Sequence, residues 1–158
     1  GLCLVGSEMC IRDRDIDAFA RASLWQLGKD YAHGTGHGVG HYLSVHEGPQ
    51  RISKFSSVEF KEGMIISNEP GFYEEGRFGI RIENLILVQI SEVGSNNSFL
   101  EFETLTFVPI DRRLISINLL DIGEREWINN YHNQCWQRAK DQVTVTTRAW
   151  LKTMTRPL

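Results

Sequence analysis

The stretch that constrains this chain most is His33-Gly34-Thr35-Gly36-His37-Gly38-Val39-Gly40. Glycine occupies every second position, so half of the stretch has no side chain with which to pack. Glycine is favoured where a backbone turns sharply or where another group approaches it closely. We therefore expect the backbone of residues 33–40 to pass close to another part of the molecule or to turn there.

Before and after this glycine-rich stretch the pattern predicts regular elements. Residues 15–28 carry apolar side chains at three- and four-residue spacings and end in glycine, which predicts an amphipathic helix. The apolar positions of that helix are Ile16, Phe19, Ala20, Leu24 and Leu27. Three short runs rich in branched and aromatic residues predict strands at 64–67, 80–89 and 99–108, the last two joined by a polar turn at 94–98.

The last part of the chain has a helical pattern. Residues 123–140 predict one amphipathic helix and residues 143–154 a second, shorter one. The order is therefore a helix, then mostly antiparallel strands, then flanking helices. This order indicates the α+β fold class.

Composition excludes several classes of protein. The chain has 158 residues, of which 41% are hydrophobic and 23% charged, and its net charge is −3. That balance is typical of a globular domain or part of one. The longest basic block is Arg112-Arg113, so we expect no nucleic-acid partner. No window approaches the roughly 18 apolar residues of a membrane span, and three cysteines do not make a disulfide framework, so we expect a cytoplasmic protein without a membrane segment.

The first fourteen residues differ in character from the rest. They show no helical or strand periodicity, and residues 4–13 resemble the translation of a transposase adapter used in sequencing libraries. We interpret residues 1–14 as a non-native leader, the alternative being a genuine disordered one. On the first interpretation the biological protein continues upstream, and this chain is a C-terminal portion of it.

Four of the five histidines, His33, His37, His41 and His46, lie close together in the sequence. A single histidine is usually structural, but four in a glycine-rich stretch favour a functional role. In an extended chain His33, His37 and His41 would be about 13 Å apart in successive pairs, given a rise of about 3.3 Å per residue. We expect at most one or two of them to bind a given ion and the others to contact a substrate.

Glu83 lies in the predicted strand 80–89, on the same face as Arg81 and Leu85. Both faces of that strand are mainly apolar, so we expect it to be covered on both sides and Glu83 to be buried. A buried carboxylate needs a cationic partner. Two partners remain open at this point: an ion pair with Arg81, or a metal ion with Arg81 as an outer orienting group.

Glu69 precedes Pro70, which favours an extended backbone at the end of a strand. Considered alone, this glutamate could equally be a turn residue or a ligand. Its occurrence in one chain with His37 and Glu83 favours the ligand, because histidine and carboxylates together form metal sites.

Four ordered motifs carry a resemblance to a known family. They are residues 33–40 as quoted, Val45-His46-Glu47-Gly48-Pro49, Asn68-Glu69-Pro70-Gly71 and Arg81-Ile82-Glu83-Asn84. Together they resemble the signatures of aminopeptidase P, the Xaa-Pro aminopeptidases of the pita-bread metallopeptidase family. The resemblance extends from Asp15 to the C-terminus, where Leu105-Thr106-Phe107-Val108-Pro109-Ile110-Asp111 and the closing helices are similar to the tail of the long cytosolic form.

The resemblance implies a role for most of the singled-out residues. It implies that His37, Glu69 and Glu83 are three of the five ligands of a dinuclear metal centre and that Glu69 is also the general base. His33 and His46 would contact the substrate and the developing oxyanion, and Arg81 would support the ligands from outside; His41 has no implied role. The other two ligands are aspartates that the family carries upstream of its equivalent of helix 15–28, and Asp13, Asp15 and Asp17 are not substitutes for them.

The resemblance also implies a fold, a cofactor and a reaction. The fold would be the C-terminal part of a pita-bread fold, with residues 15–110 belonging to the catalytic domain and 111–158 forming a helical extension. One imidazole among four carboxylates favours two Mn²⁺ ions over zinc. Such a pair would activate water and polarise the scissile carbonyl. The reaction would release the N-terminal residue of peptides with proline at position two.

Further expectations concern activity, alternative functions and assembly. With two ligands missing, we expect this chain alone to be inactive. A prolidase or a related pita-bread peptidase is the alternative enzyme, and a metal-free peptide-binding module on the same scaffold is the alternative of another class. The apolar closing helices would suit a homodimer contact.

Overall fold

The computed structural model describes residues 3–4, 13–42, 44–91 and 99–158, and the side chains of residues 3–4 and 13–15 are not described. The chain forms two compact units, Gly1–Thr106 and Phe107–Leu158. Across the described residues, no helix combines the length and the apolar character needed to cross a membrane.

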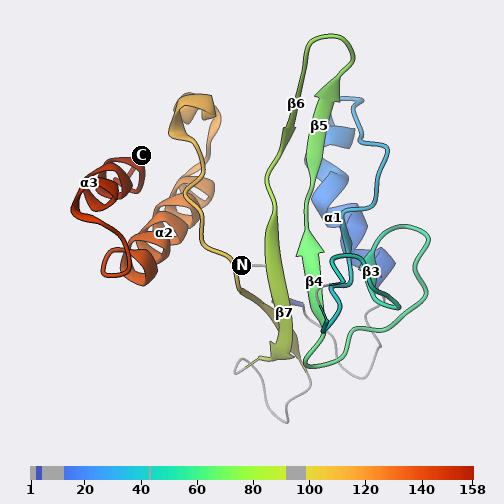
Figure 1. Ribbon diagram of the computed structural model, residues 1–158. Helices are drawn as coiled ribbons and strands as arrows, with labels where there is room; N and C mark the ends of the chain where they lie inside the picture. Colours follow the sequence, from blue (N-terminus) through green and yellow to red (C-terminus); the bar gives the residue numbers. More distant parts are fainter. Residues whose placement is uncertain (1–2, 5–12, 43, 92–98) are drawn as a thin grey trace. The chain divides into compact units, whose positions relative to one another are not determined.

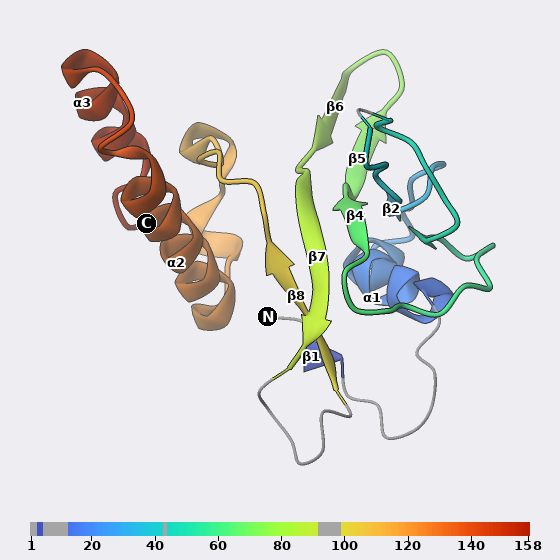
Figure 2. The same ribbon diagram turned by 60° about the horizontal axis from the view of Figure 1, so that its bottom comes forward.

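The main sheet of the first unit is antiparallel throughout and has the strand order β1-β8-β7-β4 (Figures 1 and 2). Its strands are β1 (Cys3–Leu4), β4 (Ile65–Asn68), β7 (Asn84–Ile90) and β8 (Leu100–Thr104). The strand predicted at 64–67 is present with a shift of one residue, and the strand predicted at 99–108 is present but shorter, because it ends at Thr104. The turn predicted at 94–98 lies outside the described residues.

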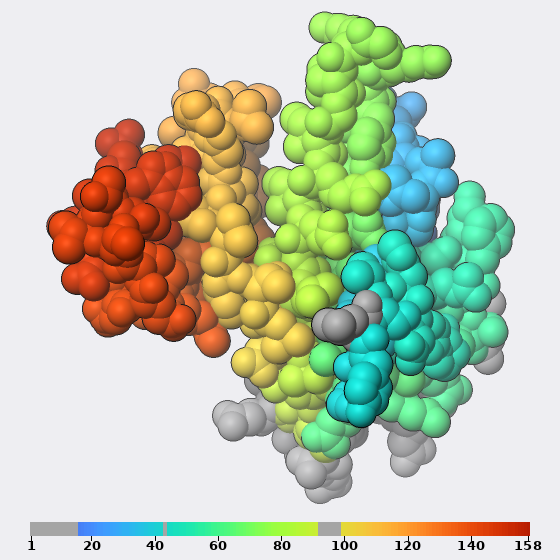
Figure 3. All heavy atoms as spheres, in the orientation of Figure 1, coloured from blue at the N-terminus to red at the C-terminus, as the bar shows by residue number. Residues whose placement is uncertain are grey.

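Two small antiparallel pairs complete the strands of this unit. β2 (Gly36–His37) pairs with β3 (Arg51–Ile52), and β5 (Gly71–Glu74) pairs with β6 (Phe78–Arg81). The β5–β6 hairpin turns at Gly76, whose φ of +70° is a conformation that favours glycine. Figure 3 shows this hairpin in green, projecting from the unit, and every residue of β6 is exposed.

The prediction of one continuous strand at 80–89 is wrong, because parts of two strands occupy this range. The chain leaves β6 at Arg81 and enters β7 at Asn84, so residues 82–83 lie between two strands that belong to different sheets. The physical reason is a change of partner: β6 pairs with β5, whereas β7 pairs with β4 and β8. Of β6 and β7, β7 is the one that contributes to the core, through Ile86 and Val88, whereas every residue of β6 is exposed.

Helix α1 (Asp13–Trp25) confirms the helix predicted at 15–28, with a turn that ends at Gly28 (φ +67°). Its buried face differs from the predicted apolar stripe. Ile16 joins the core, but Phe19 is 66% exposed and Leu27 72% exposed. The charged residues Asp17 and Arg21 are buried instead, because each has polar partners that replace water.

The core of the first unit is one apolar cluster. Its buried members are Ile16, Ile52, Phe60, Ile66, Ile86 and Val88. They come from α1, β3, the loop before β4, and strands β4 and β7. This cluster fixes β4 and β7 next to each other, so their ends present Glu69 and Glu83 from neighbouring positions.

The second unit contains two short 3₁₀ helices, Arg112–Leu114 and Ile117–Leu119, followed by α2 (Ile122–Ala139) and α3 (Val145–Met154). Both predicted helices are thus confirmed to within two residues. Asp121 and Glu124 form a capping box at the start of α2. The buried groups of the unit are Ile128, Tyr131, His132, Cys135, Leu151 and Thr155.

The leader predicted at 1–14 lies mostly outside the described residues. Within it, Cys3 and Leu4 pair with Glu101 and Leu100 of β8, and α1 begins at Asp13. Whether the leader is native stays a prediction.

Candidate metal centre

The glycine-rich stretch runs against strand β4, as its composition predicts. A side chain at Gly36 would collide with the Ser67 carbonyl, and one at Gly38 would collide with the Glu47 carbonyl. This close approach lets the His37 amide donate a hydrogen bond to Ser67 Oγ at 2.9 Å. The absence of side chains therefore places the His37 imidazole beside the end of β4.

Glu69 follows β4 and is held on three sides. Its amide donates to the Thr35 carbonyl at 2.7 Å, and its side chain is largely buried. Ser67 Oγ donates to Oε1 at 3.0 Å, and Arg81 Nη1 donates to Oε2 at 2.8 Å. The carboxylate thus has a fixed orientation and one cationic neighbour.

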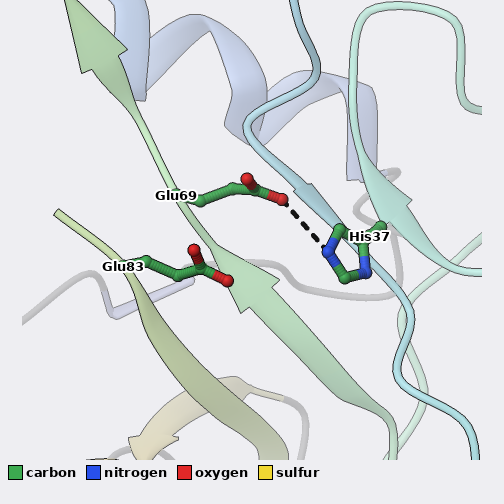
Figure 4. A group of neighbouring side chains, drawn as sticks. All are labelled: His37, Glu69 and Glu83. Carbon is green, nitrogen blue, oxygen red and sulfur yellow. Dashed lines mark ion pairs between the residues drawn. The ribbon is translucent and has the colours of Figure 1, made fainter. Parts of the chain in front are cut away.

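Glu83 completes a group of three residues that could hold a metal ion, the His37 cluster (His37, Glu69 and Glu83), shown in Figure 4. One ligand atom from each residue lies within 4.8 Å of the others. The prediction that Glu83 is buried is wrong, because its position between β6 and β7 leaves it exposed. The ion pair considered with Arg81 is also not formed: Arg81 binds Glu69 instead.

The hydrogen bonding of His37 determines which of its ring nitrogens faces Glu69 with a lone pair. His37 Nδ1 lies 3.0 Å from the Gly38 carbonyl, which can only accept, so Nδ1 carries a hydrogen. In neutral His37 the lone pair is then on Nε2, which lies 3.2 Å from Glu69 Oε1 (dashed line in Figure 4). Two electron-pair donors that face each other at this distance need a proton or a cation between them.

A chain of hydrogen bonds connects Glu69 to His33. Arg81 donates from Nη1 to Glu69 and from Nε to Tyr73 Oη at 2.9 Å. Tyr73 Oη lies 2.9 Å from His33 Nε2, and His33 Nδ1 donates to the Gly34 carbonyl at 2.7 Å. The hydrogen bond to Tyr73, followed by the charges of Glu69 and Glu83, raises the pKa of Arg81 above its ordinary value.

Sequence reasoning missed Tyr73. The signal was the pair of glycines around it: side chains at Gly71 or Gly79 would collide with the Tyr73 ring. β5 and β6 pair in a register that aligns Gly71 with Arg81 and Tyr73 with Gly79. The ring therefore lies over glycine positions, and its hydroxyl reaches Arg81.

The remaining histidines occupy different places. The His46 ring is 4.1 Å from the His37 ring, centroid to centroid, and both line a pocket of about 340 Å³. The other residues around that pocket are Gly38, Glu47, Gly48, Pro49, Gln50 and Arg51. His41 is exposed, packs edge-on against Tyr42 and is not a member of the His37 cluster.

Asp17 is not a member of the His37 cluster. It belongs to a second polar group, the Asp17 cluster (Asp17, Arg21, Tyr31 and Thr35). Asp17 accepts from Arg21 Nε at 2.7 Å and from Thr35 Oγ1 at 2.6 Å, and it is 1% exposed. Both Asp17 oxygens thus accept hydrogen bonds within the buried interior, whereas the side chains of Asp13 and Asp15 lie outside the described ones.

The His37 cluster fits a hard divalent cation. Two carboxylates and one imidazole nitrogen form an oxygen-rich donor set. Glu83 has no hydrogen bond or ion pair within the described part of the chain, so its oxygens remain free to bind. The arrangement can therefore supply three ligands from three separate segments of the first unit.

The chain is similar in sequence to known metallopeptidases. Residues 9–89 match the sequence model of metallopeptidase family M24, and residues 98–158 match that of the C-terminal region of peptidase M24. A probable Xaa-Pro aminopeptidase P from Coprinopsis cinerea is 47% identical over 151 residues, covering 90% of this chain and 24% of the relative. Aminopeptidase P2 of Arabidopsis thaliana is 48% identical over 149 residues, covering 90% of this chain and 21% of the relative.

A solved structure is similar as well. The crystal structure of X-prolyl aminopeptidase from Caenorhabditis elegans, described as a cytosolic enzyme with a di-nuclear active site, superposes with a TM-score of 0.84 at 38% identity. The match covers 94% of this chain and 25% of that one. The chain therefore spans about a quarter of the length of these relatives, and its α+β fold agrees with theirs.

Proposed function

This chain belongs to metallopeptidase family M24, and from that premise we propose that it supplies part of the active site of an Xaa-Pro aminopeptidase. The observation that carries the proposal is the His37 cluster, in which three ligand atoms converge within 4.8 Å.

We propose that His37, Glu69 and Glu83 hold the metal ions of a dinuclear centre, with two aspartates from upstream of the α1 equivalent as further ligands. The donor set favours Mn²⁺. Such ions would supply Lewis-acid activation of water and of the scissile carbonyl. This expectation rests on donor chemistry and on the family resemblance together.

The side chains of this chain would perform the other steps. Glu69 would accept the proton of the attacking water, and Arg81 and Ser67 would hold its carboxylate in place. His46, beside His37, and His33, hydrogen-bonded to Tyr73, would contact the substrate and the developing oxyanion. The product would be a free N-terminal residue and a peptide that begins with proline.

A prolidase is the alternative enzyme, because the same three ligands would suit both reactions. A metal-free peptide-binding module is the alternative of another class. The unpartnered Glu83 argues against the module, since a binding scaffold without metal has no physical need to collect two carboxylates and an imidazole.

We also propose a cytoplasmic location, peptide substrates rather than nucleic acid, and a homodimer contact through the closing helices.

Calorimetry with Mn²⁺ tests the metal proposal directly. This chain should bind Mn²⁺ weakly, and a version extended upstream to include the two aspartates should bind two ions far more tightly. In this chain Glu83→Gln should remove the weak binding, while Glu75→Gln, an exposed carboxylate on the β5–β6 turn, should leave it unchanged. Tight binding of two ions by the unextended chain would contradict the proposed ligand set.

Activity tests the enzyme proposal. In the extended protein Glu83→Ala should abolish hydrolysis of an Xaa-Pro peptide, and Glu75→Ala should not. Unchanged turnover by Glu83→Ala would remove Glu83 from the site. Faster cleavage of an Xaa-Pro dipeptide than of longer Xaa-Pro peptides would favour the prolidase.

A further inference from the structure

The second unit contains a pocket of about 420 Å³ that the proposed function does not use. It is lined by Arg112, Arg113, Ile117, Thr153, Met154, Arg156 and Leu158. This volume is in the range of pockets that hold small organic ligands. Three of its seven lining residues are arginines, and none is acidic.

The three arginines do not contribute equally to the charge of the pocket. Arg113 forms an ion pair with Asp111, with 2.6 Å between Arg113 Nη2 and Asp111 Oδ2, so the charge of Arg113 is largely balanced. Arg112 donates from Nη2 to the Pro157 carbonyl at 2.9 Å. Its Nε and Nη1 are buried and have no hydrogen-bond partner among the described residues. Arg112 therefore contributes an unbalanced positive charge to the pocket wall.

Arg156 adds a second unbalanced charge. It is exposed, and no ion pair or hydrogen bond is found for it in the described part of the chain. Burial, and then the positive charge of Arg156, lower the pKa of Arg112 below its ordinary value, so the two guanidinium groups act on each other. A partly buried cation beside a second cation is costly unless an anion balances them.

The rest of the wall decides what kind of anion fits. Ile117, Met154 and Leu158 provide an apolar side, and Thr153 offers a hydroxyl. A bare inorganic ion would leave this apolar side without a contact. A ligand with an anionic head and a short apolar body would use both sides.

We propose that this pocket binds a small organic oxyanion, a carboxylate or phosphate group on a short apolar body, with Arg156 and the buried charge of Arg112 as its counter-charges. Arg156 makes the first contact, because its guanidinium is accessible. Arg112 acts from the wall and holds the end of the chain through Pro157.

Calorimetry on the full 158-residue chain with phenyl phosphate, benzoate and benzyl alcohol tests the proposal. Phenyl phosphate or benzoate should bind, and the comparison of the two identifies the preferred head group. Benzyl alcohol should bind at least tenfold more weakly, because it lacks the charge. Equal binding of benzyl alcohol, or no binding of either anion, would overturn the proposal.

Two variants locate the site. Arg156→Gln should weaken anion binding about tenfold or more, the size of a lost charge-assisted hydrogen bond. Arg148→Gln is the matched control, because Arg148 is also an exposed arginine, lies within α3, pairs with Asp141 and does not line the pocket. Unchanged binding by Arg156→Gln, or an equal loss in Arg148→Gln, would show that the pocket is not the site. Thermal melts of both variants establish that they are folded.

Discussion

Two polar clusters of the first unit differ in their chemistry. In the sequence, Gly36 alone separates Thr35 of the Asp17 cluster from His37 of the His37 cluster. In the Asp17 cluster both oxygens of the buried carboxylate accept hydrogen bonds. Arg21 uses its other nitrogens on Asp30 and on the carbonyls of Tyr31 and His33. In the His37 cluster Glu83 has no such partner, and His37 Nε2 faces a carboxylate oxygen.

This difference separates a structural role from a binding role. Burial opposes the charge of Arg21, but its hydrogen bonds to Asp17 and Asp30 outweigh burial and raise its pKa. A network with every donor and acceptor matched stabilises one conformation and has no capacity for a ligand. In the His37 cluster Ser67 and Arg81 donate to Glu69, but Glu83 accepts no hydrogen bond from the described residues, so its carboxylate is available to a cation. The first cluster should therefore control stability, and the second should control binding.

Removing Arg21 should have the largest effect. Arg21→Met leaves Asp17 buried without its cation, which costs about 3–5 kcal/mol of unfolding free energy. Urea denaturation followed by far-UV circular dichroism measures the loss. The double variant Asp17→Asn/Arg21→Met should recover part of it, because no unpaired charge is then buried. A loss below about 1 kcal/mol in the single variant would mean that the Asp17 cluster is not a structural network.

The glycine between the clusters comes next. Gly36→Ala places a methyl group against the Ser67 carbonyl, and this overpacking should cost about 1–3 kcal/mol. Weak Mn²⁺ binding should fall as well, because His37 is pushed from Glu69. Gly48→Ala is the control, since nothing lies within 4 Å of the added carbon, and it should change stability by less than about 0.5 kcal/mol. Equal stabilities for the two variants would contradict the close approach.

Asp30 tests the edge of the Asp17 cluster. It is half exposed, so Asp30→Asn should cost only about 0.2–1 kcal/mol at neutral pH. The hydrogen bond from Arg21 lowers the pKa of Asp30 below its ordinary value of 3.8. The unfolded chain then binds the proton more readily, so this stabilisation is complete above pH 3.8 and is lost as the pH falls through the folded-state pKa. Urea midpoints of wild type and variant should converge in that acidic range and separate above it.

Glu83 should affect stability least. Glu83→Gln removes an exposed carboxylate without a partner, so the unfolding free energy should change by less than about 0.5 kcal/mol without metal. With Mn²⁺ the wild type should gain stability according to the ratio of metal concentration to dissociation constant, and the variant should gain none. Thermal melts with and without Mn²⁺ measure both. A large loss of stability without metal would make Glu83 a structural residue and weaken the contrast between the clusters.

Some of this protein followed from local patterns in the sequence. Three- and four-residue spacing predicted α1, α2 and α3, and runs of branched residues predicted β4, β7 and β8. These patterns are readable because helices and strands repeat over short distances. The alternating glycines likewise predicted a close backbone approach, which Gly36 and Gly38 make against β4 and Glu47.

Other features required tertiary structure. The break between β6 and β7 depends on which strands pair. Because residues 80–89 look like one continuous strand in the sequence, the exposure of Glu83 at this break could not be predicted. The burial of Asp17 and Arg21 depends on Thr35 and on the His33 carbonyl, which lie beyond the end of α1, and the contact of Tyr73 with Arg81 depends on the register of the β5–β6 hairpin. The sequence alone determined which residues carry ligand chemistry, because that is a property of each side chain. Only the tertiary structure decided which carboxylates have partners and which remain free, because hydrogen bonding and burial are properties of neighbours in space.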